Sequence, residues 1–182
     1  MNRKTPYAIP SNIPPESSIN TYLVGAHFHD CYAIDVPNEP RTALGYFLAA
    51  VKYTPSWVNA LMALRNKVVR LVGLKDLGAL GGLKPSKPES AYKPGDRIGI
   101  FTLISNTENE VLMGDSDKHL DVVLSVYRNP PSPSGVRSVA ITTVVHIHNL
   151  LGRLYMFPVT PLHKLIAPAV LSRVLAEPDK TM

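Results

Sequence analysis

Two histidines at alternate positions, His146 and His148, are the residues whose type and spacing come closest to a metal site. On an extended strand they would share one face, and imidazole nitrogen is a common zinc ligand. The sequence offers no cysteine nearby and no obvious third ligand, and the alternation places both histidines on the more polar face of the strand. We therefore expect a structural role for this pair and no bound metal.

An acidic stretch, Glu108–Asp121, offers a second kind of chemistry. Its spacing loosely resembles a calcium-binding loop, but it lacks the glycine at the sixth position and the glutamate at the twelfth. The run Gly114–Asp117 is typical of a hairpin turn whose aspartates bond to the local backbone. Asp121 can form a structural ion pair with Arg97 or Arg153, or an acid–base pair with a histidine. We favour the structural ion pair over catalysis.

Other catalytic signatures are missing from the sequence. Cys31 is the only cysteine, and His27 and His29 beside it do not make a triad geometry. The GALGG run at Gly78–Gly82 lacks the strand, lysine and helix of a phosphate-binding loop. No platform of aromatic and basic residues for nucleic acid is visible. We expect no cofactor and no nucleic-acid partner, and we lean against an enzyme.

The composition is that of a single globular domain, with 45% hydrophobic and 18% charged residues in a chain of 182. A single cysteine excludes an internal disulfide, which fits a reducing, cytoplasmic location. The N-terminus has no apolar core of a signal peptide. The apolar C-terminal segment is interrupted by charges and prolines, so we expect no transmembrane helix.

The net charge of +5 is unevenly distributed, because Pro40–Lys75 and Val122–Ala176 contain no acidic residue. The cations are spaced rather than clustered, which favours solvated faces over a basic face that meets an anionic membrane or partner. The core also requires the apolar stripe of Trp57, Leu61 and Leu64. For both reasons we expect no binding to anionic vesicles.

Hydrophobic periodicity predicts an α+β domain at 26–176, after a mostly extended N-terminal arm at 1–25 that lies outside the core and before a tail at 177–182. A first strand at 26–36 leads to a helix capped by Thr42 and to a second helix that begins at Trp57. A loop follows at 78–95. Four more strands are predicted at Arg97–Ile104, Glu110–Gly114, Leu120–Tyr127 and Arg137–His148.

The C-terminal segment reads as a long, kinked helical region. Asn149 is suited to cap a first short helix, Thr160 with Pro161 to begin another, and Pro168 to kink it. The period-two pattern of the last strand predicts which side chains face this helix. They are Val139, Ile141, Val145 and Ile147, whereas His146 faces away.

Three segments carry a resemblance to a known family. They are GDRIGIF at Gly95–Phe101, GDSDKHLDVVLSV at Gly114–Val126 and TTVVHIHNLLGRLYMFPVTPLHKLI at Thr142–Ile166, with the ordered motifs HLD, HN–GR–Y and P–H. The chain resembles an uncharacterised bacterial family known as a domain of unknown function, some members of which are fused to dehydrogenase-like proteins. The resemblance covers about Ala26 to Leu175.

That family in turn resembles the START or polyketide-cyclase (SRPBCC-like) superfamily. The resemblance implies a helix-grip fold, in which a curved antiparallel sheet surrounds a long C-terminal helix and two shorter helices follow the first strand. It also implies a cavity between sheet and helix. Our candidate ligand-binding residues are Trp57, Arg97, Asp121, His148, Arg153 and Tyr155.

These observations leave three hypotheses open. The first is binding of a small hydrophobic ligand in the implied cavity. The second is a peripheral interaction module that docks through the basic helices of Arg41–Lys75 on a membrane or a partner protein. The third is a cyclase- or hydrolase-type enzyme that uses an acid–base pair such as Asp121 and a histidine.

Overall fold

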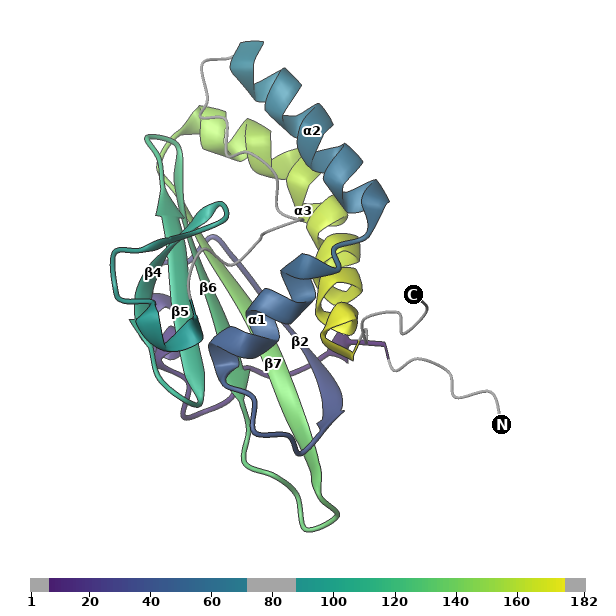
Figure 1. The fold of residues 1–182 in the computed structure, drawn as a ribbon. Coiled ribbons are helices and arrows are strands. Elements are labelled where there is room, and N and C mark those ends of the chain that lie inside the picture. The colour runs from purple at the N-terminus through teal and green to yellow at the C-terminus, as the bar shows by residue number, and fades with distance from the viewer. Residues whose placement is uncertain (1–6, 72–87, 176–182) are drawn as a thin grey trace.

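The structure, a computed structural model, describes residues 7–71 and 88–175 and shows one antiparallel sheet with helices against one face (Figure 1). The N-terminal elements are β1 (Ile9–Pro10), the 3-10 helix η1 (Ser18–Tyr22), β2 (Phe28–Pro37), α1 (Ala43–Lys52) and α2 (Ser56–Leu71). They are followed by η2 (Glu89–Ala91), β3 (Arg97–Ile98), β4 (Phe101–Asn106), β5 (Glu110–Ser116), β6 (Leu120–Arg128), β7 (Val136–Ile147), α3 (Leu150–Leu171) and η3 (Ser172–Leu175).

The seven strands lie in the order β1-β2-β7-β6-β5-β4-β3, and every neighbouring pair is antiparallel. The first long strand, β2, therefore pairs with the last, β7, along ten residue pairs that fix its register. In Figure 1 the three helices lie on one side of this curved sheet. The predicted α+β, helix-grip-like class is confirmed, including the long C-terminal helix against the sheet.

Strand β7 divides its side chains between the two faces of the sheet as the alternation predicts. Val139 and Ile141 are buried in the same cluster as Ala167 of α3, so their face is the inner, helix-covered one. His146 lies on the opposite face, where its Nε2 is 3.1 Å from the carbonyl oxygen of Val24. The predicted face assignment is confirmed.

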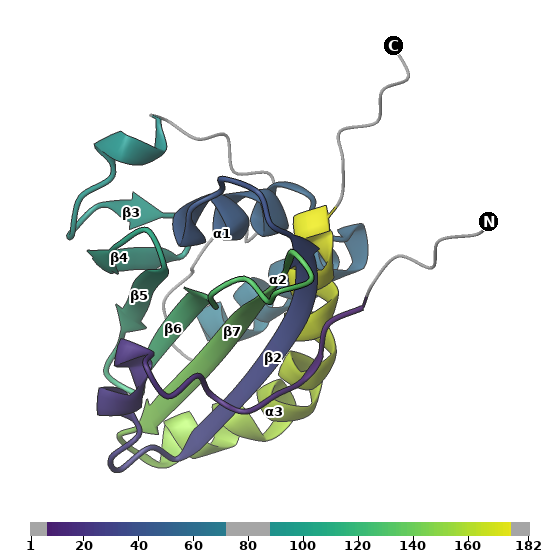
Figure 2. The ribbon, with the colours of Figure 1, turned by 90° about the horizontal axis from the view of Figure 1, so that it is seen from below.

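After the edge strand β1, residues 11–25 cover the outer face of the sheet, which they cross on the side turned away from α3 (Figure 2). Ile19 is fully buried against Val123 and Val144. The prediction that this segment lies outside the core is wrong. The prolines do keep most of it extended, but its apolar side chains cover strands that would otherwise leave a second apolar face exposed.

A buried carboxylate, Glu110 at the start of β5, fastens this segment to the sheet. It accepts hydrogen bonds from the Ser17 hydroxyl, from the Ser18 backbone N–H at 2.9 Å and from the Ser125 hydroxyl at 2.7 Å. Burial alone would raise the pKa of Glu110, but these three donors outweigh it and lower the pKa below its ordinary value. Glu110 is therefore a satisfied anchor on the outer face.

Helix α3 begins where Asn149 predicts, since the side-chain oxygen of Asn149 accepts the Gly152 amide at 3.0 Å. The predicted new start at Thr160 with Pro161 is wrong, because α3 continues through its three prolines. Packing of its inner face on the sheet overrides the low helix propensity of proline. Pro158 and Pro161 are exposed, and the helix bends around the sheet in Figure 1, as helices with broken outer hydrogen bonds do.

Two turns differ from their predicted positions. The predicted strand at 97–104 is two strands, β3 and β4, joined by a tight turn at Gly99, whose φ of 61° favours glycine. The predicted turn at 114–117 comes later, because β5 runs through most of it and the Asp117 amide donates to the carbonyl of Leu120 at 3.0 Å. Most of the predicted loop at 78–95 lies outside the described residues.

Candidate functional site

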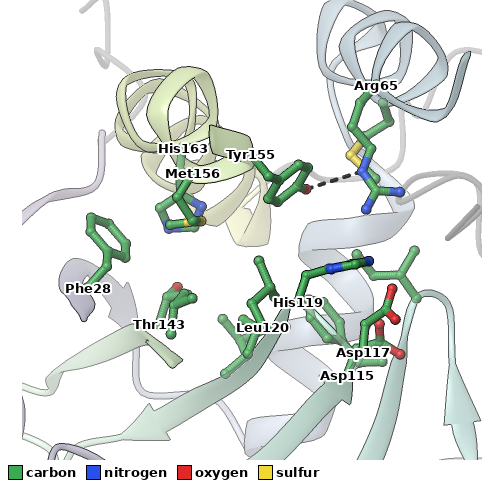
Figure 3. A pocket seen from close by; sticks show the side chains of 16 residues that line it. Phe28, Arg65, Asp115, Asp117, His119, Leu120, Thr143, Tyr155, Met156 and His163 are labelled. Atoms are coloured by element: carbon green, nitrogen blue, oxygen red, sulfur yellow. Dashed lines mark hydrogen bonds between the residues drawn. The ribbon is translucent and has the colours of Figure 1, made fainter. Parts of the chain in front are cut away.

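A cavity lies between the inner face of the sheet and the three helices. It consists of two adjoining chambers of about 190 and 170 Å³, whose walls share Met62, Ile100, Phe101, Leu124, Thr143 and His163. Figure 3 shows the larger chamber. A cavity of about 150 Å³ holds a benzene ring, so the two chambers together can hold a molecule of two rings.

The smaller chamber is almost entirely apolar. Ala50 and Val51 of α1 form one wall, and Ala167 and Val170 of α3 form another. Phe47 and Phe101 meet edge to face, with ring centroids 6.3 Å apart. Such a surface favours an apolar occupant over water.

His163 stands at the junction of the chambers and pairs with Asp30, which lines neither chamber itself. Nε2 of His163 lies 3.2 Å from Oδ1 of Asp30, and the rings of His163 and Phe28 are perpendicular, with centroids 5.8 Å apart. Both partners are largely shielded, with side chains 24% and 13% exposed. Oδ2 of Asp30 is buried with no hydrogen-bond partner among the described residues. The carboxylate fixes the orientation of the imidazole.

The position of this pair follows from the strand period. Phe28, Asp30 and Tyr32 alternate along β2 and so share its inner face, while His163 projects from the sheet side of α3 into both chambers. Sequence reasoning missed both partners. Two signals were available: the acid at an inner position of an apolar strand, and the P–H motif at Pro161–His163.

The opening of the larger chamber is polar. Arg65 of α2 donates from Nε to the hydroxyl of Tyr155 at 3.2 Å and lies over its ring, 5.4 Å from the centroid. Asp115, Asp117 and His119 of the β5–β6 hairpin line the other side, as Figure 3 shows. An apolar interior with charged groups of both signs at its entrance suits an apolar molecule that carries a polar group.

The resemblance motifs meet where α3 starts beside this hairpin. The side-chain amide of Asn149 donates to the Lys118 carbonyl at 3.0 Å, and the His148 amide donates to the His119 carbonyl at 2.9 Å. At Gly152 an added Cβ would overlap the His119 carbonyl oxygen. In the HN–GR pattern, Asn149 therefore caps α3 and Gly152 lets the helix backbone lie close to the hairpin. Together they place Tyr155, one helical turn after Gly152, at the cavity.

Asp121 pairs with neither predicted arginine. Its carboxylate lies 3.0 Å from Nε2 of His148 and accepts a hydrogen bond from the Ser116 hydroxyl. Burial alone would raise the pKa of Asp121, but these hydrogen bonds and the charge of His148 outweigh it and lower the pKa below its ordinary value. The pair is about two-fifths exposed and does not line the cavity. Arg97 instead lies 3.9 Å from Asp115.

Of the six candidate residues, Tyr155 alone lines the cavity within the described parts of the chain. Arg97 and Asp121 line a shallow hollow on the outer face of the sheet. Trp57, at 43%, and Arg153 are exposed on α2 and α3. The prediction that the core requires the whole α2 stripe is wrong, since Leu64 is 58% exposed.

The described residues contain no group of three histidine, cysteine or acidic side chains that could hold a metal ion. Cys31 is buried on the outer side of β2, where the Thr142 hydroxyl lies 3.4 Å from its sulfur. Burial raises the pKa of the thiol; the Thr142 hydrogen bond opposes this and the charge of Asp30 adds to it. A thiol in this state is a poor nucleophile.

These features define the protein as an α+β domain whose antiparallel sheet wraps around a long C-terminal helix and encloses a mostly apolar cavity. The family model described as "Protein of unknown function (DUF2867)" matches residues 22–170, so the chain belongs to this family. No curated protein and no solved structure matches the chain.

Proposed function

We propose that this domain binds a small, mainly apolar molecule in the cavity between the sheet and α3. The observation that carries the proposal is the pair of adjoining chambers, apolar except for a few polar groups at their junction and mouth. Pockets of this kind are typical ligand sites. The resemblance to START-like proteins supports it, because that fold places a cavity here. The single cysteine supports a cytoplasmic location.

The polar groups indicate what the molecule carries. His163 and Thr143 lie where the two chambers join, so a ligand that fills both places a hydroxyl or carbonyl group beside them. Arg65 and Tyr155 stand at the opening. We therefore propose a ligand of about two rings, or an equivalent aliphatic length, with one hydrogen-bonding group inside.

Fluorescence titration with 2-naphthol tests this, because the probe has two apolar rings and one hydroxyl. We expect saturable binding at one site. Ala167→Phe, which fills the smaller chamber, should weaken binding at least tenfold. Ala63→Phe on the exposed side of α2 is the matched control and should bind as the wild type does. Equal binding by all three proteins would reject the proposal.

The His163–Asp30 pair supports a second candidate, a hydrolase that acts on an apolar ester. His163 would take a proton from water, the resulting oxygen nucleophile would attack the ester carbonyl, and the alcohol would leave with a proton returned by His163. Hydrolysis of 2-naphthyl acetate to acetate and 2-naphthol measures this. Activity that His163→Gln abolishes while 2-naphthol still binds would establish an enzyme. No activity above background would leave a binding protein.

A further inference from the structure

The outer side of α3 carries an uninterrupted apolar stripe, which we call the outer α3 stripe. It consists of Leu150, Leu154, Phe157, Pro161 and Leu165, all exposed, with Phe157 at 85% and Leu150 at 72%. Successive members are three or four residues apart, so they lie on one face along about 22 Å of helix. Scattered exposed apolar residues are common, but a continuous stripe of this length marks an interaction surface.

The outer α3 stripe lies on the opposite side of α3 from the face that packs on the sheet. Met156, Ala167 and Val170 on the inner side are buried against the sheet and the cavity. Among the described residues, Leu150–Leu175 is long and apolar enough to cross a membrane, yet only 28% of its most apolar window is buried. Because its inner face is packed on the sheet, the helix has its outer face free to lie along an interface rather than across one.

The charges beside the stripe identify the kind of partner. Arg153 and Lys164 are exposed and lie along one edge of the stripe by helical spacing. The sequence has no acidic residue from Val122 to Ala176. Two copies of such a face would bring like charges together, whereas an anionic lipid surface neutralises them. A helix with an apolar face and flanking cations is the pattern of interfacial membrane binding.

We propose that the outer α3 stripe docks this domain on an anionic lipid surface, with Phe157 and Leu154 in the acyl boundary and Arg153 and Lys164 at the headgroups. The proposal does not depend on ligand binding in the cavity. It differs from the expectation of no vesicle binding, which considered only the spacing of the cations and the apolar stripe of the second helix.

Flotation with phosphatidylcholine vesicles, with and without phosphatidylserine, tests the proposal. The wild type should bind the anionic vesicles at physiological salt and lose most of that binding at high salt. Removing both cations, as in Arg153→Gln/Lys164→Gln, should weaken binding roughly 30-fold. Phe157→Ser should weaken binding to both kinds of vesicle at least tenfold.

Val24→Ser is the matched control, because Val24 is 87% exposed on the outer-face segment of the sheet; it should bind as the wild type does. Circular dichroism establishes that each variant is folded. The proposal is overturned if the wild type does not bind anionic vesicles, or if Phe157→Ser binds equally well. It is also overturned if light scattering shows a dimer that Phe157→Ser dissociates, since a second copy would then cover the stripe.

Discussion

Replacement of Glu110 by glutamine tests how the N-terminal segment is held on the sheet. Oε1 of Glu110 accepts from the Ser17 and Ser125 hydroxyls, and Oε2 accepts from the Ser18 N–H. Glutamine preserves the volume but supplies one acceptor oxygen and one NH₂ group. Either the Ser18 N–H or the two hydroxyls must then face a donor. A buried donor without its acceptor costs about 1–3 kcal/mol, so we expect Glu110→Gln to lower the free energy of unfolding by that amount.

The lowered pKa of Glu110 determines how its contribution to stability changes with pH. The folded-state pKa of Glu110 lies below its ordinary value of 4.5, so the unfolded chain takes up the proton first as pH falls. The stabilisation by Glu110 is therefore fully present above that value and is lost as pH falls through the folded-state pKa. The difference between wild type and Glu110→Gln should shrink over the same range.

Urea unfolding followed by circular dichroism, at neutral pH and at several values below about pH 4.5, measures both effects. Glu16→Gln, an exposed change in the same segment, is the control and should alter the unfolding free energy by less than about 0.5 kcal/mol. If Glu110→Gln proves as stable as the wild type at neutral pH, or if the difference grows as pH falls, the anchoring role is refuted.

Three further predictions concern other sites. His163→Leu should destabilise the fold by about 3 kcal/mol, because it leaves the Asp30 carboxylate uncompensated, whereas Asp30→Leu/His163→Leu should regain most of that loss in a urea double-mutant cycle. Gly152→Ala should cost about 1–3 kcal/mol, read from the same unfolding curves, because its methyl group would overlap the His119 carbonyl; an unchanged midpoint would contradict the close approach. Cys31 should react with iodoacetamide far more slowly in the folded than in the urea-unfolded chain, and equal rates would show that the thiol is accessible.

The elements that could be predicted from the sequence are those in which apolar residues recur regularly on one buried face. One face of β7 has apolar residues at every second position and α1 has a capping threonine, and both elements occur where predicted. Helix α3 was divided wrongly because local proline signals were given more weight than its burial against the sheet. Ile19 covers the outer face through contacts with Val123 and Val144, which are far from it in the sequence. The composition of a proline-rich segment does not predict such contacts.

The candidate site was less predictable, because it depends on residues that are far apart in the sequence. Asp30 and His163 are 133 positions apart, and the register of β2 on β7 together with the fit of α3 brings them together. Tyr155 was identified through the HN–GR–Y motif. This motif points to the cavity because Gly152 allows α3 to pack closely on the β5–β6 hairpin. Asp121 and His148 were each identified, but their pairing required the structure.

Methyl NMR of the protein titrated with 2-naphthol tests the central claim, that the cavity is a ligand site, most directly. The account predicts that shifts concentrate at Met62 and Ile166, which line the cavity, and that Val144 in the outer-face cluster stays unchanged. Shifts confined to Leu154 and Leu165 on the outer side of α3, with the cavity methyls unmoved, would contradict the claim.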